Sequence, residues 1–403
     1  MTRNPTKDPT FENALAFAQD LIRIPSPSGQ EGAVVERVRR EMEMLGLRDV
    51  RVDEVGNVVG VVPGQGTAPP VLLNCHTDVV AEGDHAEWEH PPFGAEVADG
   101  FLHGRGAMDI KGPLALQTYA AAALAGRAAG DVIVAHTVFE ERGGLGMKHL
   151  LESGTVRPGA VGIGESTHGD ICIGHRGRGA VEDVLQGRAG HASAPDRAHN
   201  ALDLVPDVLA AALELAAGPS VDALLGAASL VATGIDVLPE SRNVIPDRVT
   251  VVLDWRVLPG TDADAMTSQV REAVSRHVGD LPDGFGITVA MAQERQTAFT
   301  GVMNERNLFT PGFLMDPQDS LVRAAAAAVG RREADGPAAV RPWTFATDGG
   351  WTRGVFDIPT VGFAPGEERY AHTNRERLDV EEARWAFGRY PDLICALHDH
   401  LGQ

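Results

Sequence analysis

The sequence predicts an α/β fold, in which a layered sheet domain carries a smaller α+β domain as an insertion. Apolar runs typical of buried strands alternate with helical patterns over the first 178 residues. Near residue 179 the pattern changes to half-exposed strands and amphipathic helices, and near residue 294 it changes back. The chain of 403 residues is also too long for one core, because single cores stop growing beyond about 250–300 residues.

The larger domain is predicted from the order of its strands and helices. Residues 10–47 have helical periodicity, broken by "PSPSG", and residues 50–64 have the pattern of a β-hairpin. The elements expected next are a buried strand at 69–80, a helix at 113–129, a buried strand at 131–141 and a helix at 144–154. This alternation is typical of a sheet covered by helices.

The inserted domain is predicted to span residues 179–293, with its helices on one face of an antiparallel sheet. Its expected elements are a strand at 179–195, a helix at 200–218, two strands about a proline turn at 240–260 and a helix at 262–279. After residue 294, a helix at 320–330 and a strand at 358–366 return to the first pattern. We therefore assign residues 1–178 and 294–403 to the larger domain.

The charge of the chain argues against nucleic-acid and membrane binding. With 35 basic and 56 acidic residues the formal charge is −21, which disfavours a nucleic-acid groove or a patch for anionic membranes. The amino-terminal sequence lacks a signal-peptide pattern, and no run of about 18 apolar residues occurs. We expect a cytoplasmic protein.

Cysteine usage restricts the kind of metal site. Cys75, Cys172 and Cys395 are widely spaced and odd in number, so neither a disulfide framework nor a four-cysteine zinc site is expected. Cys75 adjoins His76 and is either a ligand or, as its place at a strand end favours, a small buried residue. A metal in this protein would be bound through oxygen and nitrogen.

Acidic and imidazole side chains recur where apolar strands end. The residues concerned are His76, Asp78, Asp109, Glu140, Glu141, Glu165 and His372. Because ligands of α/β sheets bind beyond the carboxyl ends of the strands, these side chains can converge. Singly, each is as easily a helix cap, a surface charge or a solvated turn. Their recurrence favours a site for zinc, cobalt or manganese, with one glutamate of the adjacent pair as ligand and the other as base.

The segments "HTD", "GRGAMDIKG", "FEERGGLG", "GES", "GRAGHASAP", "SRNVIPDRVTVVLDWR" and "APGEERYAHTNRE" resemble a known family in order and spacing. It is the family of dinuclear zinc amidohydrolases and metallopeptidases that includes aminoacylase, acetylornithine deacetylase, succinyl-diaminopimelate desuccinylase and glutamate carboxypeptidase. The resemblance extends from about residue 12 to the end and is nearest to a subgroup of peptidases and deacetylases. It implies a zinc-peptidase-like three-layer catalytic domain with a mixed sheet, and an inserted dimerisation domain.

The resemblance also implies the roles of the strand-end residues. Asp109 would bridge two divalent metal ions, expected to be Zn²⁺ with Co²⁺ or Mn²⁺ as alternatives. The other ligands would be His76 and Glu165 at one ion, and Glu141 and His372 at the other. Asp78 would orient the His76 imidazole, and Glu140 would act as general base towards metal-bound hydroxide and later as proton donor to the leaving amine.

In the inserted domain, the resemblance implies that His191 reaches the active site of a partner subunit and stabilises the oxyanion. Asn243 and Arg256 would hold a substrate carboxylate, which the fork of arginine suits. Arg256 could instead only pair within its sheet, and His191 could only cap a turn. "TFATDGGWTRG" departs from the commoner family pattern, although Asp348 and Gly349 can line the pocket.

The predicted function is metal-dependent hydrolysis of an amide bond in an N-acyl amino acid or a small peptide-like molecule with a carboxylate, by a homodimer. A dipeptidase or carboxypeptidase of the same family is the near alternative, because both present a carbonyl to the metals and a carboxylate to Arg256. A non-catalytic metal-binding protein on the same fold and an unrelated single-zinc hydrolase are the remote alternatives. Residues 300–320 are expected to form a lid or pocket wall.

Overall fold

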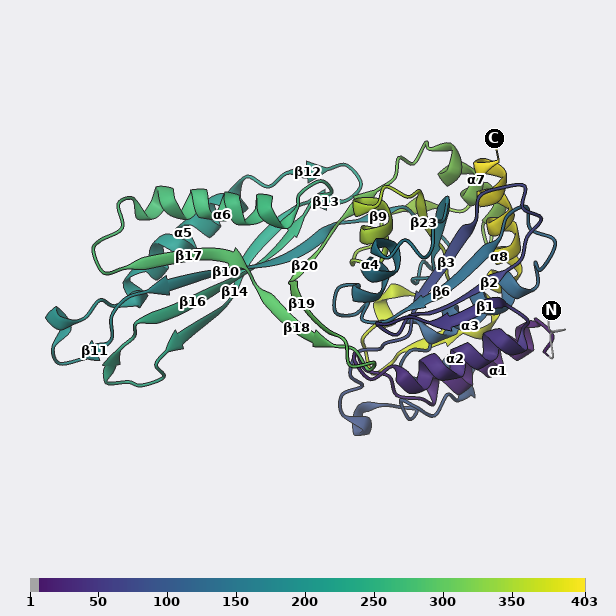
Figure 1. The fold of residues 1–403 in the computed structure, drawn as a ribbon, viewed down its shortest axis with the longest axis horizontal. Helices are drawn as coiled ribbons and strands as arrows, with labels where there is room; N and C mark the ends of the chain where they lie inside the picture. The colour runs from purple at the N-terminus through teal and green to yellow at the C-terminus, as the bar shows by residue number, and fades with distance from the viewer. Residues whose placement is uncertain (1–6, 403) are drawn as a thin grey trace. The chain divides into compact units, whose positions relative to one another are not determined.

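The computed structural model describes residues 7–402, which form two compact units. Within these residues, unit 1 comprises 7–174, 296–304 and 314–402, and unit 2 comprises 175–295 and 305–313. The chain can be followed through both units by its colour in Figure 1. The smaller unit is therefore an insertion in the larger one.

Unit 1 contains an eight-stranded sheet in the order β1-β2-β6-β3-β7-β23-β8-β22. The strands are β1 (Arg48–Val52), β2 (Val58–Val62), β6 (Val132–Thr137), β3 (Val71–His76), β7 (Ala160–Ile163), β23 (Thr360–Gly362), β8 (Ile171–Cys172) and β22 (Val340–Arg341). β3 runs parallel to both β6 and β7, whereas β2 is antiparallel to β1 and to β6. This mixed α/β sheet confirms the predicted fold class, including the expected hairpin.

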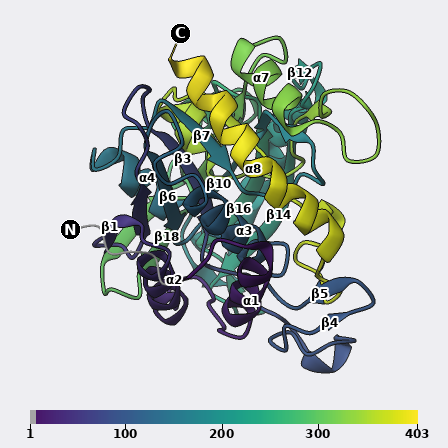
Figure 2. The same cartoon turned by 90° about the vertical axis from the view of Figure 1, so that its right-hand side faces the viewer.

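Helices cover the sheet of unit 1. They are α1 (Phe11–Ile22), α2 (Gly32–Met44), α3 (Lys111–Ala122), α4 (Leu145–Glu152), α7 (Ser320–Val329) and α8 (Val380–Leu401). α3 packs against α1, α8 and the central strands, and Figure 2 shows α8 in front of the sheet. Every residue of β3, β6 and β7 is buried, as expected of strands that have both faces covered. α3 ends at Ala122, before the end of the alanine-rich run, and the chain then turns through Gly126, whose φ is +71°.

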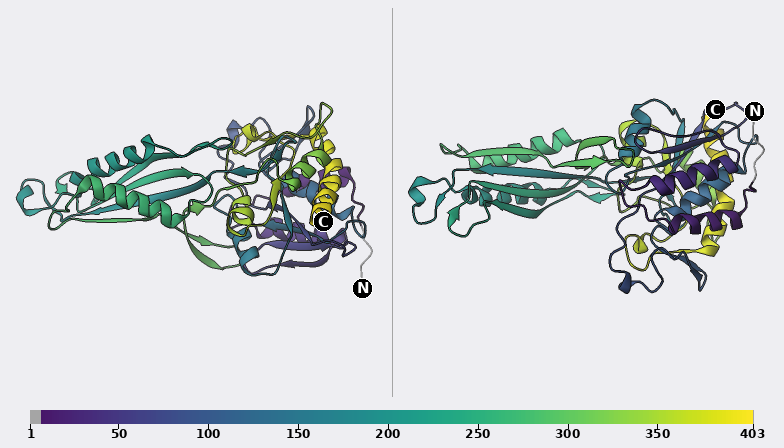
Figure 3. Two further views of the ribbon diagram at one scale, coloured as in Figure 1. Left: turned by 90° about the horizontal axis from the view of Figure 1, so that it is seen from above. Right: turned by 60° about the horizontal axis from the view of Figure 1, so that its bottom comes forward.

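Unit 2 is an antiparallel sheet with two helices on one face. Its strands are β14 (Ser229–Leu238), β16 (Arg248–Val257), β10 (Gly177–Gln186) and β17 (Gly286–Met291) in that order, with β20 (Phe309–Thr310) also paired to β10. The helices α5 (Val205–Ala217) and α6 (Ala263–Val278) pack against each other and against these strands, as Figures 1 and 3 show. This is the α+β architecture expected for the insertion.

Short pairings complete the two units. The remaining strands are β4 (Val97–Ala98), β5 (Phe101–His103), β9 (Gly174–His175), β11 (Gly190–His191), β12 (Val221–Asp222), β13 (Gly226–Ala227), β15 (Val244–Ile245), β18 (Gln293–Thr297), β19 (Met303–Asn307), β21 (Phe313–Leu314) and β24 (Arg377–Asp379). β18 and β19 form a two-stranded ribbon whose tip belongs to unit 1. Among the described residues, no helix combines the length and the apolar character needed to span a membrane.

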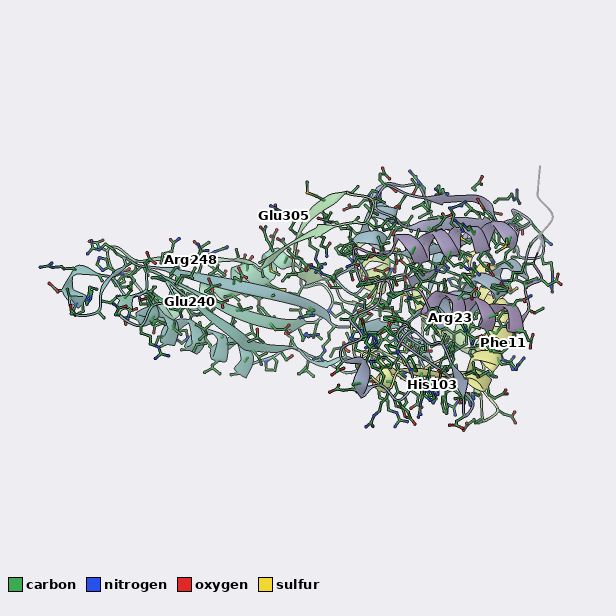
Figure 4. All side chains as sticks on the ribbon, turned by 90° about the horizontal axis from the view of Figure 1, so that it is seen from below. Phe11, Arg23, His103, Glu240, Arg248 and Glu305 are labelled. Carbon is green, nitrogen blue, oxygen red and sulfur yellow. The ribbon has the colours of Figure 1, made fainter. Side chains whose placement is uncertain are left out.

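The two ends of the unit 2 sheet are defined by the register of its long strands. Arg248 opposes Gln186 at one end, and Arg256 opposes Arg178 at the other. Arg248 and Glu240, both labelled in Figure 4, lie at the first of these ends. β11 and β15 follow or precede the long strands at that same end. Loops of unit 2 that are separated in sequence therefore meet there.

One carboxyl group is buried in the apolar core of unit 2. Asp183 lies between Val181 and Leu185 on the inner face of β10, is fully buried, and has no hydrogen-bond partner for either carboxylate oxygen within residues 7–402. Burial raises its pKa to about 7. The folded state therefore keeps a proton that the unfolded chain releases near pH 4.

This difference predicts that stability falls as the pH rises from about 4 to about 7 and then levels off. Asp183→Asn should remove this loss, and the gain in unfolding free energy should grow from near zero at pH 4 to a few kcal/mol at pH 8, at about 1.4 kcal/mol per pKa unit. Urea unfolding at both pH values measures it, with Glu182→Gln on the other face of β10 as control. An equal gain at both pH values would contradict this account.

Candidate metal and active site

The predicted site residues of unit 1 meet at one edge of its sheet. β6, β3 and β7 are adjacent and parallel, so their carboxyl ends lie at the same edge. His76 is the last residue of β3, Glu140 and Glu141 follow β6, and Glu165 follows β7. Asp109 comes from the loop before α3, and His372 from the loop after β23. The topology thus brings together side chains that are far apart in the sequence.

Asp109 lies between the two imidazoles. Its Oδ1 is 3.2 Å from His76 Nε2, and its Oδ2 is 3.2 Å from His372 Nε2. His76 Nε2 is also 3.3 Å from Glu165 Oε1, and His372 Nε2 is 3.1 Å from Glu141 Oε2. Each oxygen of Asp109 therefore faces a different pair made of one imidazole and one glutamate.

Two overlapping groups of these side chains are compact enough to hold a cation. The potential ligand atoms of His76, Glu140 and Glu165 all lie within 4.8 Å of one another, and so do those of His76, Asp109 and Glu141. Carboxylate oxygen and imidazole nitrogen are donors suited to zinc and related divalent ions. The residues present therefore fit a metal, and Glu140 stands within reach of the same place.

Electrostatics favour positive charge here. Burial, followed by the charge of Glu165, raises the pKa of Glu140 well above its ordinary value, and burial raises the pKa of Glu165 to about 7. Hydrogen bonds to Asp109 and Glu141 raise the pKa of His372 to about 10. For Asp109, burial alone would raise the pKa, but hydrogen bonds from His372 and His76 outweigh it and lower the pKa. Bound cations would relieve the repulsion between these carboxylates and displace such protons.

Asp78 contacts more than the imidazole that it was expected to orient. His76 Nδ1 lies 2.7 Å from the backbone oxygen of Asp78 and 3.5 Å from its carboxylate. The carboxylate accepts hydrogen bonds from the N–H groups of Glu140 and Glu141, at 3.1 and 3.3 Å, and from Ser28 Oγ at 2.6 Å. Asp78 thus also fixes the turn that carries the adjacent glutamates.

Ser28 and Glu31 are site-supporting residues that the sequence analysis missed. Glu31 is fully buried, and its Oε1 accepts the N–H of Phe139 at 3.3 Å, just before Glu140. Phe139 has a φ of +57°, a conformation that a non-glycine residue adopts only where its surroundings hold it. The sequence shows Ser28 only as part of the "PSPSG" break between helical segments, and nothing in it distinguishes Glu31 from an ordinary helix-start residue.

Asp348 and Gly349 are buried and do not face solvent. Asp348 Oδ2 accepts a hydrogen bond from Thr137 Oγ1 at 2.8 Å, and burial raises its pKa to about 7. Asp348 therefore contacts the last residue of β6, just before the turn that carries Glu140. A contact of Asp348 or Gly349 with substrate stays a prediction.

The remaining predicted site residues belong to unit 2. His191 is exposed at the β11 end of the sheet, where its Nδ1 accepts the N–H of Ser193 at 3.1 Å. Asn243 is its neighbour, since the Asn243 carbonyl accepts the N–H of Ala192 at 3.0 Å. Arg256 Nε donates to Asp254 Oδ1 at 2.8 Å, and 39% of its side chain is exposed. The pairing of Arg256 within its sheet is thus observed, and its exposed part is free to contact a ligand.

A mixed α/β sheet with carboxylates and imidazoles clustered at the carboxyl ends of its strands is an arrangement suited to a metal-binding enzyme. Residues 72–390 match the model of Peptidase family M20/M25/M40, and the chain belongs to this family. The match confirms the family to which the sequence was compared and the predicted class, a metallohydrolase of amide or peptide bonds.

Curated relatives and solved structures agree with this assignment. The chain is 29% identical to the uncharacterized protein YgeY of Escherichia coli over 365 residues, which cover 90% of this chain and 88% of the relative. It is 31% identical to succinyl-diaminopimelate desuccinylase of Methylorubrum populi over 346 residues, covering 80% and 84%. An M20 family metallo-carboxypeptidase from Sulfolobus solfataricus has the same fold, with a TM-score of 0.73 at 15% identity over 96% of this chain and 99% of that one.

Proposed function

We propose that the protein hydrolyses the amide bond of an N-acyl amino acid, with two divalent cations and Glu140 as general base, as a cytoplasmic homodimer. The observation that carries this proposal is the placement of Asp109, whose two oxygens face His76 and His372 separately. One carboxylate shared between two donor sets is what a pair of bridged cations requires. The three cysteines are free, which is consistent with a reducing compartment.

The cations would be held by His76, Asp109 and Glu165 on one side, and by Asp109, Glu141 and His372 on the other. When bound, they would polarise the substrate carbonyl and acidify water. A Bacillus subtilis protein with this fold, at 16% identity and a TM-score of 0.69 over 96% of this chain and 98% of that one, is described as a dinuclear metal binding peptidase. The donor set supports Zn²⁺, with Co²⁺ and Mn²⁺ as alternatives.

Glu140 is the residue that we propose to move the proton. Its carboxyl is buried, and burial together with the charge of Glu165 raises its pKa well above the ordinary value. Bound cations would displace this proton and leave Glu140 as a carboxylate that can accept a proton from water. The hydrogen bond from the backbone N–H of Glu140 to the Asp78 carboxylate keeps the turn in place. The Glu140 side chain would then take a proton from water and deliver it to the leaving amine.

The substrate class rests on the curated relatives. Desuccinylases at 31% and 34% identity support an acyl group on the amine of an amino acid, with the exposed guanidinium of Arg256 for its carboxylate. A dipeptidase or carboxypeptidase is the second candidate, which neighbours named as peptidases support through their fold. Both candidates use the same cations and base.

The geometry within unit 2 supports a dimer with shared sites. The strand from Arg248 to Arg256 spans about 26 Å at ~3.3 Å per residue, and His191 and Asn243 lie near its Arg248 end. Arg256 and Asn243 of one chain therefore cannot hold the same small substrate. Because the N–H of Ser193 bonds His191 Nδ1, a neutral His191 carries its proton on Nε2, as an oxyanion donor from a partner subunit would.

The edge of unit 2 offers a surface for such a partner. Among the described residues, β14 is an edge strand that pairs with β16, and it exposes Val231, Ile235 and Leu238. The helix α5 exposes Leu213. A long apolar edge strand invites pairing with another chain. We propose that two copies of the chain associate through this edge.

The first test is an assay for release of free amine from a panel of N-acetyl, N-succinyl and N-formyl amino acids and of dipeptides. We expect chelator-sensitive release from one acyl class by protein that contains two cation equivalents. Release from dipeptides alone would select the second candidate. Lack of release from any member, or a single cation equivalent with full activity, would refute the proposal.

Glu140→Gln should keep the fold and the cation content while turnover falls by ~10²–10⁴-fold, because it removes only the proton acceptor. His372→Ala should instead lower the cation content, measured by metal analysis of the same preparations. If Glu140→Gln retained near full turnover, or lost a cation instead, Glu140 would be a ligand or a bystander and not the base.

Mixing two inactive variants tests whether His191 acts across subunits. Glu140→Gln and His191→Ala chains, unfolded together and refolded, should regain about a quarter of wild-type activity, because half of the dimers are mixed and each has one intact site. Glu140→Gln mixed with His372→Ala is the control, since both defects lie in unit 1 and no intact site forms. Activity that stays at the level of this control would argue against a contribution in trans.

A further inference from the structure

A buried ion pair lies beside the proposed metal site but outside its predicted residues. Arg105 Nη1 is 2.5 Å from Glu376 Oε2, and their side chains are 3% and 0% exposed. Arg105 precedes Asp109 in the loop before α3, and Glu376 follows His372 in the loop after β23. The pair therefore joins two segments that are 271 residues apart in the sequence, each of which carries one proposed ligand.

The glutamate end of the pair holds the backbone of the bridging ligand. Glu376 Oε1 accepts the N–H of Met108 at 3.2 Å and the N–H of Asp109 at 3.1 Å. The other oxygen of the same carboxylate is the one that Arg105 binds. Because a carboxylate held on both sides cannot rotate freely, the main chain of Asp109 is fixed relative to Glu376.

The arginine end holds the loop of the second histidine. Arg105 Nη1 also donates to the carbonyl of Thr373 at 3.2 Å, and its Nη2 donates to the carbonyl of Ala81 at 3.4 Å. Its guanidinium also lies over the Trp88 ring, 5.1 Å from the ring centre, within the range of a cation–π contact. Thr373 directly follows His372, so the guanidinium fixes the loop one peptide beyond the ligand.

His372 needs such an anchor more than the other ligands do. Its side chain is 54% exposed, and its backbone has a φ of +60°, which neither packing nor intrinsic preference stabilises. His76, by contrast, is buried at the end of β3 and bonds the backbone of Asp78. The Arg105–Glu376 pair thus holds the backbone of Asp109, which both proposed cation sites share, and the loop of His372, which belongs to one of them.

We propose that Arg105 and Glu376 are positioning residues for the cation site formed by Asp109, Glu141 and His372. The inference rests on the proposed function, since it presumes two cations. Arginine is required because one planar group must reach a carboxylate and two carbonyls at once, which the single ammonium of lysine cannot do. Neither residue touches the substrate or the reacting atoms in this role.

The test is titration of metal-free protein with Co²⁺, followed by its absorption spectrum and by calorimetry, for wild type, Glu376→Gln, Arg105→Lys and His372→Ala. In Glu376→Gln and Arg105→Lys we expect the equivalent bound by His372 to be weakened by ~10–100-fold, as for other residues that support metal ligands. The other equivalent, which shares only Asp109 with this pair, should be weakened less. The more strongly weakened equivalent should be the Co²⁺ ion whose absorption bands are missing in His372→Ala. If Glu376→Gln does not fold, Arg105→Lys, which retains the charge, carries the test.

Arg37→Lys is the matched control, because Arg37 bonds the buried Glu41 at 2.7 Å within α2, in the same unit. It should change neither equivalent. If both equivalents were weakened equally, or if both kept their affinity in Glu376→Gln and Arg105→Lys, the positioning role would be overturned. The two-cation proposal would still stand. A wild-type protein that binds fewer than two equivalents would overturn the proposed function, and this inference with it.

Discussion

The structure of unit 1 depends on one electrostatic constraint, the burial of several carboxylates at a single edge of a sheet. Glu140, Glu141 and Glu165 are each driven towards the protonated form first by burial and then by neighbouring carboxylates. Asp109 alone is driven the other way, because both imidazoles bond it. Such an arrangement is unfavourable without positive charge between the oxygens. The chain therefore has to hold these groups in place with the rest of its fold.

The supporting contacts are made largely to the backbone. Asp78 and Glu31 bond the N–H groups of the turn that follows β6, and Glu376 bonds those of the loop before α3. The loops that carry the ligands contain two non-glycine residues in the left-handed region, Phe139 and His372. This backbone conformation persists only where surrounding contacts hold it. Rigid strands bring the loops together, and buried carboxylates then set the conformation of each loop.

Unit 2 obeys a different constraint, which is set by length. Its ten-residue strands β10, β14 and β16 separate the polar groups at their two ends by more than a small substrate can bridge. A fully apolar inner face would be the simplest core for such a sheet. Asp183 departs from it, and its carboxylate has no hydrogen-bond partner among residues 7–402. The exposed apolar edge is the feature of unit 2 that points beyond a single chain.

How much of the site was predictable follows from the chemistry of its parts. The ligand candidates could be found from the sequence because parallel strands place their carboxyl ends together, whatever the details of the loops. The residues that bond the backbone of those loops could not, since Ser28, Glu31 and Glu376 differ from ordinary turn and surface residues only in what they contact. The second role of Asp78 was hidden for the same reason.

The sequence by itself determined the α/β class, the inserted unit and the residue types of the site, because periodicity and composition act locally. The tertiary structure decided which oxygen of Asp109 faces which imidazole and which carboxylates are buried deeply enough to change their pKa. It also decided that Arg105 and Glu376 meet. These depend on distances between segments that are hundreds of residues apart, and such distances are set only when the packed core brings the segments together.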